Sequence, residues 1–252
     1  MSIPTYLSYY VLAATAAVIA TTLFGLNRAL ARADWPKQER RRTVSAVAFI
    51  LILWLAGAIT LGTMGAFHAT SGDVPTIQYG VFLPILIGAL LIWRSPLVAR
   101  IIDAVPQQWI VSVQFYRALG VIFLILYARG KLPGLFALPA GVGDVVVGVM
   151  APIVGLAYAR NPQQNGDLVA GFNLFGLADL AIAISTGFLT AASLAQPFAV
   201  EPPNELISLY PLVLIPVFLV PVSILLHLAS LAKLSRTVTE VDRRRKIGVA
   251  PV

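Results

Sequence analysis

Three ionisable side chains stand inside long apolar runs of the sequence: Arg117, Asp144 and Asp179. Arg117 lies within SVQFYRALGVIFLIL, residues 112–126, three positions after Gln114. An unpaired charge at the centre of a bilayer costs about 2.5–3.5 kcal/mol on insertion scales. We therefore expect Arg117 to face the interior of a helix bundle and to be paired with an acid, rather than to face lipid.

The composition indicates that these runs cross a membrane. The chain has 252 residues, of which 58% are hydrophobic and 12% charged, with a mean hydropathy of +0.85. Soluble domains carry about 25% charged residues, and about 20 apolar residues suffice to span a bilayer. We predict one all-α integral membrane bundle over residues 1–232, followed by a basic cytoplasmic tail over 233–252. The seven predicted transmembrane helices cover residues 5–27, 44–66, 78–94, 108–128, 138–159, 167–190 and 206–232.

The basic residues predict the orientation of this bundle. Fifteen of the eighteen Lys and Arg residues fall on one side of the predicted membrane, and the other side carries only Arg129 and Lys131. The positive-inside rule then places the N-terminus outside and the C-terminus in the cytoplasm, in a plasma membrane such as the bacterial inner membrane. We expect the bilayer to be the main partner and no nucleic acid to bind. The basic tail either lies against anionic lipid headgroups or serves only as the charge signal that orients the protein. The fifteen are Arg28, Arg32, Lys37, Arg40, Arg41, Arg42, Arg94, Arg100, Arg160, Lys233, Arg236, Arg243, Arg244, Arg245 and Lys246.

The depths of the buried charges suggest how they pair. With a rise of 1.5 Å per residue, Arg117 lies about 12 Å and Asp179 about 16 Å from the cytoplasmic ends of their helices. This difference is within the reach of an arginine side chain, so we predict an Arg117–Asp179 ion pair. Asp144 lies about 6–12 Å below the outer surface, depending on where its helix begins. We expect it to be a separate acid in the outer half of the membrane.

Helical periodicity places these charges on three stripes. If the faces of the fourth and sixth helices meet, they form a polar track across the membrane with an ion pair in its middle. We predict that Gln114, Arg117, Asp144, Asp179 and Thr186 line a pathway for a small solute or ion. The stripes are Gln107, Ile110, Gln114, Arg117 and Val121; Asp179, Ala183, Thr186 and Thr190; and Gly141, Asp144, Gly148, Ala151 and Gly155.

The chain lacks the residue sets of common active sites. It has no cysteine, and no HExxH, GxSxG, Walker or GxGxxG pattern occurs. His68 and His227 are expected near opposite faces of the membrane, as interfacial residues that cannot share a metal. We therefore predict no catalytic residue, no metal site and no cofactor, and we favour a role other than catalysis.

Two short stretches resemble known membrane families. GVGD, residues 141–144, resembles the GxGD motif of intramembrane aspartyl proteases such as presenilin. This resemblance implies a dyad between Asp144 and a second aspartate, for which the candidate, Asp179, comes later in the chain rather than earlier. RALGVIFLILYARGKL and the following AGVGDVVVGV are similar to the arginine and Gly-acid-Gly pattern of DoxX-like membrane proteins, which have fewer spans.

The last predicted helix contains Pro211, Pro216 and Pro221, each of which removes a backbone hydrogen bond and kinks a helix. Kinked helices often form binding sites or hinges in carriers, although proline is also tolerated in ordinary membrane helices. Buried charges and a kinked helix together favour a small transporter or carrier. A structural or assembly subunit of a membrane complex is the alternative, because an Arg–Asp pair can also lock helices together. An intramembrane enzyme or sensor ranks third.

Overall fold

The computed structural model describes residues 5–68, 76–191 and 200–246, with side chains described up to Thr237. These residues form helices, turns and short connections and contain no strand. Seven helical stretches within them are long and apolar enough to cross a membrane. The chain is thus a multi-pass, all-α membrane protein, and the predicted number of spans is confirmed. The spans are α1 (Thr5–Arg32), α2 (Lys37–Thr63), α3 (Ile77–Arg94), Gln107–Ala128, α7 (Gly134–Arg160), α8 (Gly166–Thr190) and Ile215–Thr237.

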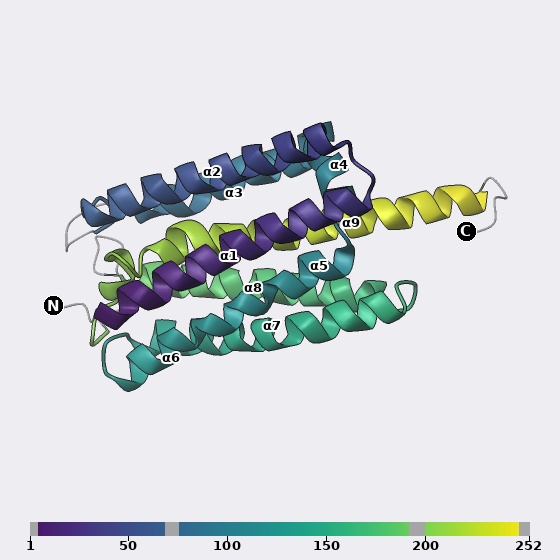
Figure 1. The fold of residues 1–252 in the computed structure, drawn as a ribbon. Coiled ribbons are helices and arrows are strands. Elements are labelled where there is room, and N and C mark those ends of the chain that lie inside the picture. Colours follow the sequence, from purple (N-terminus) through teal and green to yellow (C-terminus); the bar gives the residue numbers. More distant parts are fainter. Residues whose placement is uncertain (1–4, 69–75, 192–199, 247–252) are drawn as a thin grey trace.

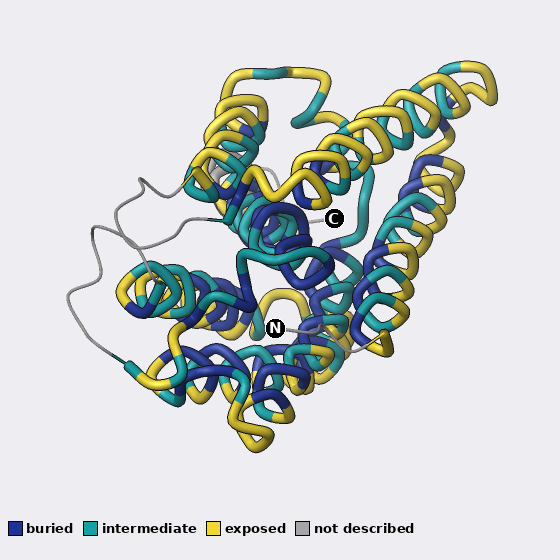
Figure 2. The backbone as a smooth tube through the Cα atoms, turned by 90° about the vertical axis from the view of Figure 1, so that its left-hand side faces the viewer, coloured by how far each residue is buried: buried dark blue, intermediate teal, exposed yellow. Residues whose placement is uncertain are grey.

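The helices run roughly along one axis, and the two termini lie at opposite ends of the bundle (Figure 1). α1 and α9 (Val220–Lys246) occupy the middle, α2 and α3 lie on one flank, and the fourth span with α7 and α8 lies on the other. α2 packs against α1, α3 packs against α9, and α8 contacts both α7 and α9. Buried positions turn toward the centre and exposed positions point outward, as expected for a bundle whose outer faces contact lipid (Figure 2).

The fourth span is not one regular α-helix. It consists of α5 (Gln107–Ser112), the 3₁₀-helix η1 (Val113–Gly120) and α6 (Val121–Ala128). A 3₁₀-helix rises about 2.0 Å per residue and places residues three apart directly above one another. Gln114, Arg117 and Gly120 therefore project from one line. Such a stretch in mid-helix is often a hinge or a strained functional segment.

The seventh span begins later than predicted, because the proline-rich stretch before it is not a regular helix. The prediction of a helix from residue 206 is wrong: residues 206–208 form only the short 3₁₀ turn η2 (Leu206–Ser208), and the span starts at Ile215. Its first turn, η3 (Ile215–Leu219), is a π-helix that contains Pro216. Proline lacks the N–H that a continuous α-helix needs, so helix formation stops around it. At the other end, α9 continues to Lys246, through most of the predicted tail.

A short helix that sequence analysis missed connects the third and fourth spans. α4 (Pro96–Ala104) begins with Pro96 at its first position, and the Ser95 hydroxyl accepts a hydrogen bond from the Val98 N–H at 3.3 Å. Both features are typical of a helix N-terminus. At its other end, Lys233 Nζ donates to the carbonyl oxygens of Ile102 at 3.3 Å and Asp103 at 2.8 Å. α4 is thereby attached to α9.

Close packing of α7 against the fourth span depends on glycine. A Cβ atom on Gly148 would lie 2.8 Å from the Ala118 Cα, and one on Gly141 would lie 2.7 Å from the Leu124 side chain. One on Gly155 would lie 2.9 Å from the Gln108 carbonyl oxygen. The predicted stripe of small residues is therefore the contact face between these helices, as is common in membranes.

Candidate functional site

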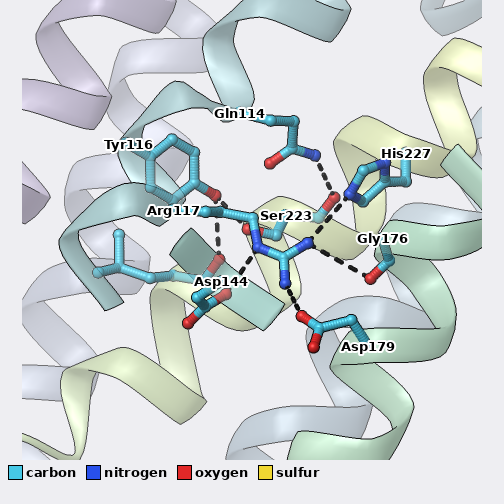
Figure 3. A network of polar contacts seen from close by, with 9 residues as sticks. Gln114, Tyr116, Arg117, Asp144, Gly176, Asp179, Ser223 and His227 are labelled. Atoms are coloured by element: carbon cyan, nitrogen blue, oxygen red, sulfur yellow. Dashed lines mark hydrogen bonds and ion pairs between the residues drawn. The ribbon is translucent and has the colours of Figure 1, made fainter. Parts of the chain in front are cut away.

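Arg117 lies near the middle of the fourth span, on η1, and is almost completely buried at 3% exposure. Its Nε donates to Asp144 Oδ1 at 2.7 Å, and its Nη2 donates to Asp179 Oδ2 (Figure 3). The guanidinium is thus shared between acids from α7 and α8. The predicted pair between Arg117 and Asp179 is formed.

The expectation that Asp144 stands apart is wrong, since it contacts the same guanidinium. α7 begins at Gly134, before residue 138, where the sequence predicted its start, and Pro139 lies inside it. Asp144 is therefore about 15 Å from the start of its helix, deep enough to reach Arg117. The larger rise of the 3₁₀ segment also changes the depth of Arg117 relative to a regular α-helix.

The remaining nitrogen of the guanidinium faces α8 and α9. Arg117 Nη1 donates to the Gly176 carbonyl oxygen at 3.3 Å and lies 3.4 Å from His227 Nε2. His227 is fully buried, so its prediction as an interfacial residue is wrong. Because the seventh span starts at Ile215 rather than at residue 206, His227 lies near its middle instead of its end.

A chain of polar side chains continues from His227 toward the end of the bundle where α5 begins. His227 Nδ1 lies 2.9 Å from Asn173 Oδ1, and Asn173 Nδ2 donates to Ser230 Oγ at 2.8 Å. Gln107 Nε2 donates to the same Ser230 hydroxyl at 2.6 Å. Gln107, Asn173, His227 and Ser230 are all buried. Polar groups thus connect the charge cluster to the first residue of α5.

Gln114 belongs to the same region but does not contact the charges. Its Nε2 donates to the Ser223 carbonyl oxygen at 3.0 Å, and its Oε1 has no hydrogen-bond partner among the described residues. The neighbouring Tyr116 hydroxyl lies 2.5 Å from Ser223 Oγ. The predicted site residue Gln114 therefore attaches η1 to α9 beside Arg117 (Figure 3).

Thr186 is not brought to the cluster. It is half-buried, and its hydroxyl donates to the Ile182 carbonyl oxygen of its own helix at 2.8 Å. Thr190, further along the predicted stripe, likewise donates to the Thr186 carbonyl oxygen at 2.7 Å. Both hydroxyls thus donate to their own helix rather than toward Asp179, and the Thr190 hydroxyl also accepts a hydrogen bond from Asn204 Nδ2 at 3.1 Å. The polar track expected to run outward from Asp179 along α8 is therefore not formed by Thr186.

Three glycines make room for the charged groups. A Cβ on Gly120 would lie 2.8 Å from Asp144 Cγ, and one on Gly143 would lie 3.0 Å from Asp179 Oδ2. One on Gly176 would lie 3.3 Å from Arg117 Nη1. Any larger residue at these positions would push the ionic groups apart. The glycines of the GVGD stretch therefore have a packing role in this chain, since Gly143 is the second of them.

Two cavities adjoin Asp144. One of about 40 Å³ is also lined by Tyr10, Tyr116 and Arg117. The other, of about 80 Å³, extends from Asp144 past Ala183 to Asn204 and Ser208. The Asp144 side chain is 17% exposed, compared with 2% for that of Arg117. Of the three charged groups in this cluster, Asp144 has the greatest access to free space.

The polar residues of the site that were not predicted from the sequence nevertheless show a regular spacing in it. Ser223, His227 and Ser230 are four and three residues apart, so they share one face of a helix. Asn173 and Gly176 precede Asp179 at intervals of three. This polar face was not recognised from the sequence because the apolar stretch was predicted to form a helix from residue 206. That start placed His227 near the end of the span instead of near its middle.

The arrangement differs from that of an aspartyl protease. A protease dyad needs two carboxylates that share a proton. The Arg117 guanidinium lies between Asp144 and Asp179 and binds each through a different nitrogen (Figure 3). The geometry is that of an ion triad rather than a dyad.

Residues 74–235 match the model of a protein family described as a domain of unknown function, DUF8737. The chain belongs to this family. A search of curated proteins gives no match, and a search of solved structures gives none. The matched region contains α3 to α8 and most of α9, and hence Arg117, Asp144, Asp179 and His227, whereas α1 and α2 precede it.

Proposed function

We propose that this protein is a carrier for protons or small cations, with Asp144 as the exchanging carboxylate. The observation that carries the proposal is the ion triad, in which one guanidinium faces two carboxylates. With both acids ionised and His227 neutral, this dry site has one negative charge in excess. Uptake of one proton or one cation would balance it, and buried uncompensated charge is costly in a membrane.

The free space beside Asp144 suits a very small cargo. A cavity needs about 10–15 Å³ to hold one water molecule, so the cavities of about 40 and 80 Å³ fit a few waters or a partly hydrated ion. The larger cavity leads toward Asn204 and Ser208, which belong to the predicted outer side. We infer that Asp144 exchanges with that side.

The polar chain from His227 to Gln107 supplies the other half of the path. Its imidazole, hydroxyl and amide groups lie between the triad and the predicted cytoplasmic end, where α5 begins. Hydrogen-bonded side chains of these kinds can pass or solvate a cation through apolar surroundings. Arg117 stands between the two halves and acts as a gate.

Two irregular helical segments carry or precede residues of this site, and they favour movement of the helices around it. Arg117 lies on the 3₁₀-helix η1, and the π-helix η3 precedes the part of α9 that carries His227. Interrupted helices next to buried charges are typical of carriers. Binding of an anionic solute by Arg117 is less favoured, because Asp144, Asp179 and the Gly176 carbonyl already accept hydrogen bonds from it.

The charge asymmetry supports a location in a plasma membrane, such as the bacterial inner membrane, with the N-terminus outside. The second candidate function is a structural subunit of a membrane complex. It is favoured by the dense packing of Arg117, which is 3% exposed. In that case the triad would lock η1, α7 and α8 together and transfer nothing.

Ion flux into liposomes distinguishes these two functions. Purified protein in liposomes is exposed in turn to a proton, a sodium and a potassium gradient, and each flux is measured with an indicator dye for that ion. We expect flux for at least one ion, and we expect Asp144→Asn to reduce it to the level of empty liposomes. Asp103→Asn is the matched control, because Asp103 forms an exposed ion pair with Arg236 outside the triad.

Full flux in Asp144→Asn would refute the role of Asp144. No flux of any of the three ions through the folded wild-type protein would refute the carrier and favour the structural subunit. If Asp144→Asn unfolds, Ala140→Cys serves as the second variant, because it keeps the triad and Ala140 lines the same cavity. Insensitivity of its flux to a thiol reagent would also contradict the path.

A further inference from the structure

A third cavity, whose lining includes no residue of the ion triad, lies between α1 and α5. It has a volume of about 600 Å³, and its walls are mostly apolar, with α1 on one side and Val105, Trp109 and Ile110 on the other. Arg28 and Arg32 stand at its edge. We call it the α1–α5 groove. Its volume is within the range of about 300–1,000 Å³ found for small-molecule sites.

We propose that the α1–α5 groove binds one phospholipid with an anionic headgroup. The acyl chains lie along the apolar walls, and the phosphate is held by Arg28 and Arg32. This inference does not depend on the proposed carrier function, since none of the residues of the ion triad lines the groove.

The length of the groove fits one leaflet of a bilayer. Its α1 wall extends from Thr21 to Arg32. This separation corresponds to about 16 Å along an α-helix. Half of a hydrocarbon core about 30 Å thick is about 15 Å. With the arginines at the headgroup level, where α1 ends, the deep end of the groove reaches the middle of the membrane.

The Arg28 and Arg32 guanidinium groups each lie near an aromatic ring but have no hydrogen-bond acceptor among the described residues. The Arg28 Cζ lies 5.5 Å from the centre of the Phe24 ring, and the Arg32 Cζ lies 4.8 Å from that of the Trp109 ring. Neither guanidinium makes a hydrogen bond or ion pair with the residues that the structure describes. A lipid phosphate would provide acceptors for both.

Two other arginines at this end of the bundle are already paired. Arg100 contacts Glu39 and Arg236 contacts Asp103, each at 2.8 Å. Arg28 and Arg32, one helical turn apart, thus present two positive charges to a single headgroup. A phosphate binds guanidinium groups through strong charge-assisted hydrogen bonds. A zwitterionic lipid has a positive group that two adjacent arginines would repel, so we commit to an anionic lipid.

Native mass spectrometry of the purified full-length protein tests the charge requirement. The protein in detergent is incubated with phosphatidylglycerol, with phosphatidylcholine or with inorganic phosphate. We expect one phosphatidylglycerol to be retained in preference to phosphatidylcholine. The Arg28→Gln/Arg32→Gln variant should reduce this preference about tenfold, because each basic residue near a membrane surface adds to the affinity for anionic lipid.

The matched control is Arg94→Gln/Arg160→Gln. It removes the same charge from the ends of α3 and α7, outside the groove. We expect its lipid preference to equal that of the wild type. An equal loss in both variants would mean that total charge, rather than the groove, selects the lipid, and would overturn the proposal.

A second pair of variants tests whether lipid binding requires the open shape of the groove. Gly25 lines the groove and Gly57 lies on α2, and a Cβ on either would meet nothing within 4 Å. Both glycines can therefore be replaced without a clash at Cβ. Gly25→Leu should fill the groove and abolish retention of the lipid, whereas Gly57→Leu should leave it unchanged.

Three further results would overturn the proposal. The first is equal retention of the two lipids by the wild-type protein. The second is retention of inorganic phosphate with no lipid, which would make the arginines a site for a soluble anion. The third is a dimer that Gly25→Leu disrupts, which would mean that a second copy of the chain occupies the groove.

Discussion

α2 and α7 are both 27 residues long, and both cross the membrane, yet they are buried to very different extents. The most apolar 18-residue stretch of α2 is more hydrophobic than that of α7, although α2 begins with charged residues, and only Ala58 and Gly62 are buried on α2. α7 has nine buried residues and contacts α5, η1, α6 and α8. The more hydrophobic membrane-spanning stretch is therefore the less buried one, which is the reverse of what is usual in water-soluble proteins.

The comparison shows that hydrophobicity does not select the interior of this bundle. Lipid solvates apolar side chains as well as a protein interior does, so α2 gains little by leaving it. α7 is drawn inward by glycines that permit close contact and by Asp144, which needs a partner. Figure 2 shows the same distribution, with buried positions concentrated toward the centre of the molecule.

The largest effect is expected from Arg117→Ala in the interior. The substitution leaves Asp144 and Asp179 without their partner, and breaking a buried ion pair costs about 3–5 kcal/mol. Unfolding in mixed micelles of increasing denaturing detergent measures the change. Arg94→Ala, at the exposed end of α3, is the control. Equal stability of the two variants would mean that the triad contributes nothing to the fold.

The next largest effect is expected from glycine substitutions, which should destabilise the protein when made on α7 but not when made on α2. Gly148→Leu places its side chain against the backbone of Ala118, which cannot move aside, and we expect a loss of about 3 kcal/mol in the free energy of unfolding. Gly57→Leu on α2 meets open space, and we expect a change within about 0.5 kcal/mol. The same unfolding assay applies. Similar losses at both positions would show that α2 is packed in the membrane, and the comparison would fail.

The smallest effect is expected for Glu39→Gln on α2. Its ion pair with Arg100 is at the surface, and both side chains are more than one third exposed. Such pairs contribute about 0–1 kcal/mol, and less at high salt. We expect a change of about 0.5 kcal/mol or less at low salt and none at 1 M salt. A larger effect that persists at high salt would show that the Glu39–Arg100 ion pair attaches α2 to the rest of the bundle.

The apolar lengths of the seven spans were sufficient to predict the fold class, because a bilayer requires helices of about 20 residues. The Arg117–Asp179 pair could also be predicted, from depth alone. Asp144 and His227 were misplaced, because depth is counted from a helix start. Neither the start of α7 before Pro139 nor the delayed start of the seventh span is evident from hydropathy.

Other features depend on contacts between distant segments. The 3₁₀ form of η1 accompanies its close contact with α7, in which Arg117 meets Asp144, 27 residues away in the sequence. The α1–α5 groove is lined by residues of α1, α4, α5 and α9, which are far apart in the sequence, so no local pattern records it. α4 was missed, although Ser95 and Pro96 carry the pattern of a helix start.

The central claim is that water or ions reach the triad through the cavity beside Asp144. The natural chain has no cysteine, so a single introduced thiol can be followed without background. Ala140→Cys lines that cavity, whereas Ala137→Cys, also a buried alanine on α7, does not. The rate of modification by a small cationic methanethiosulfonate, added to either face of sealed proteoliposomes, is the measurement. We predict modification of Ala140→Cys from the face that carries Arg129 and no modification of Ala137→Cys. An unreactive Ala140→Cys on both faces, under every ion gradient, would contradict the account.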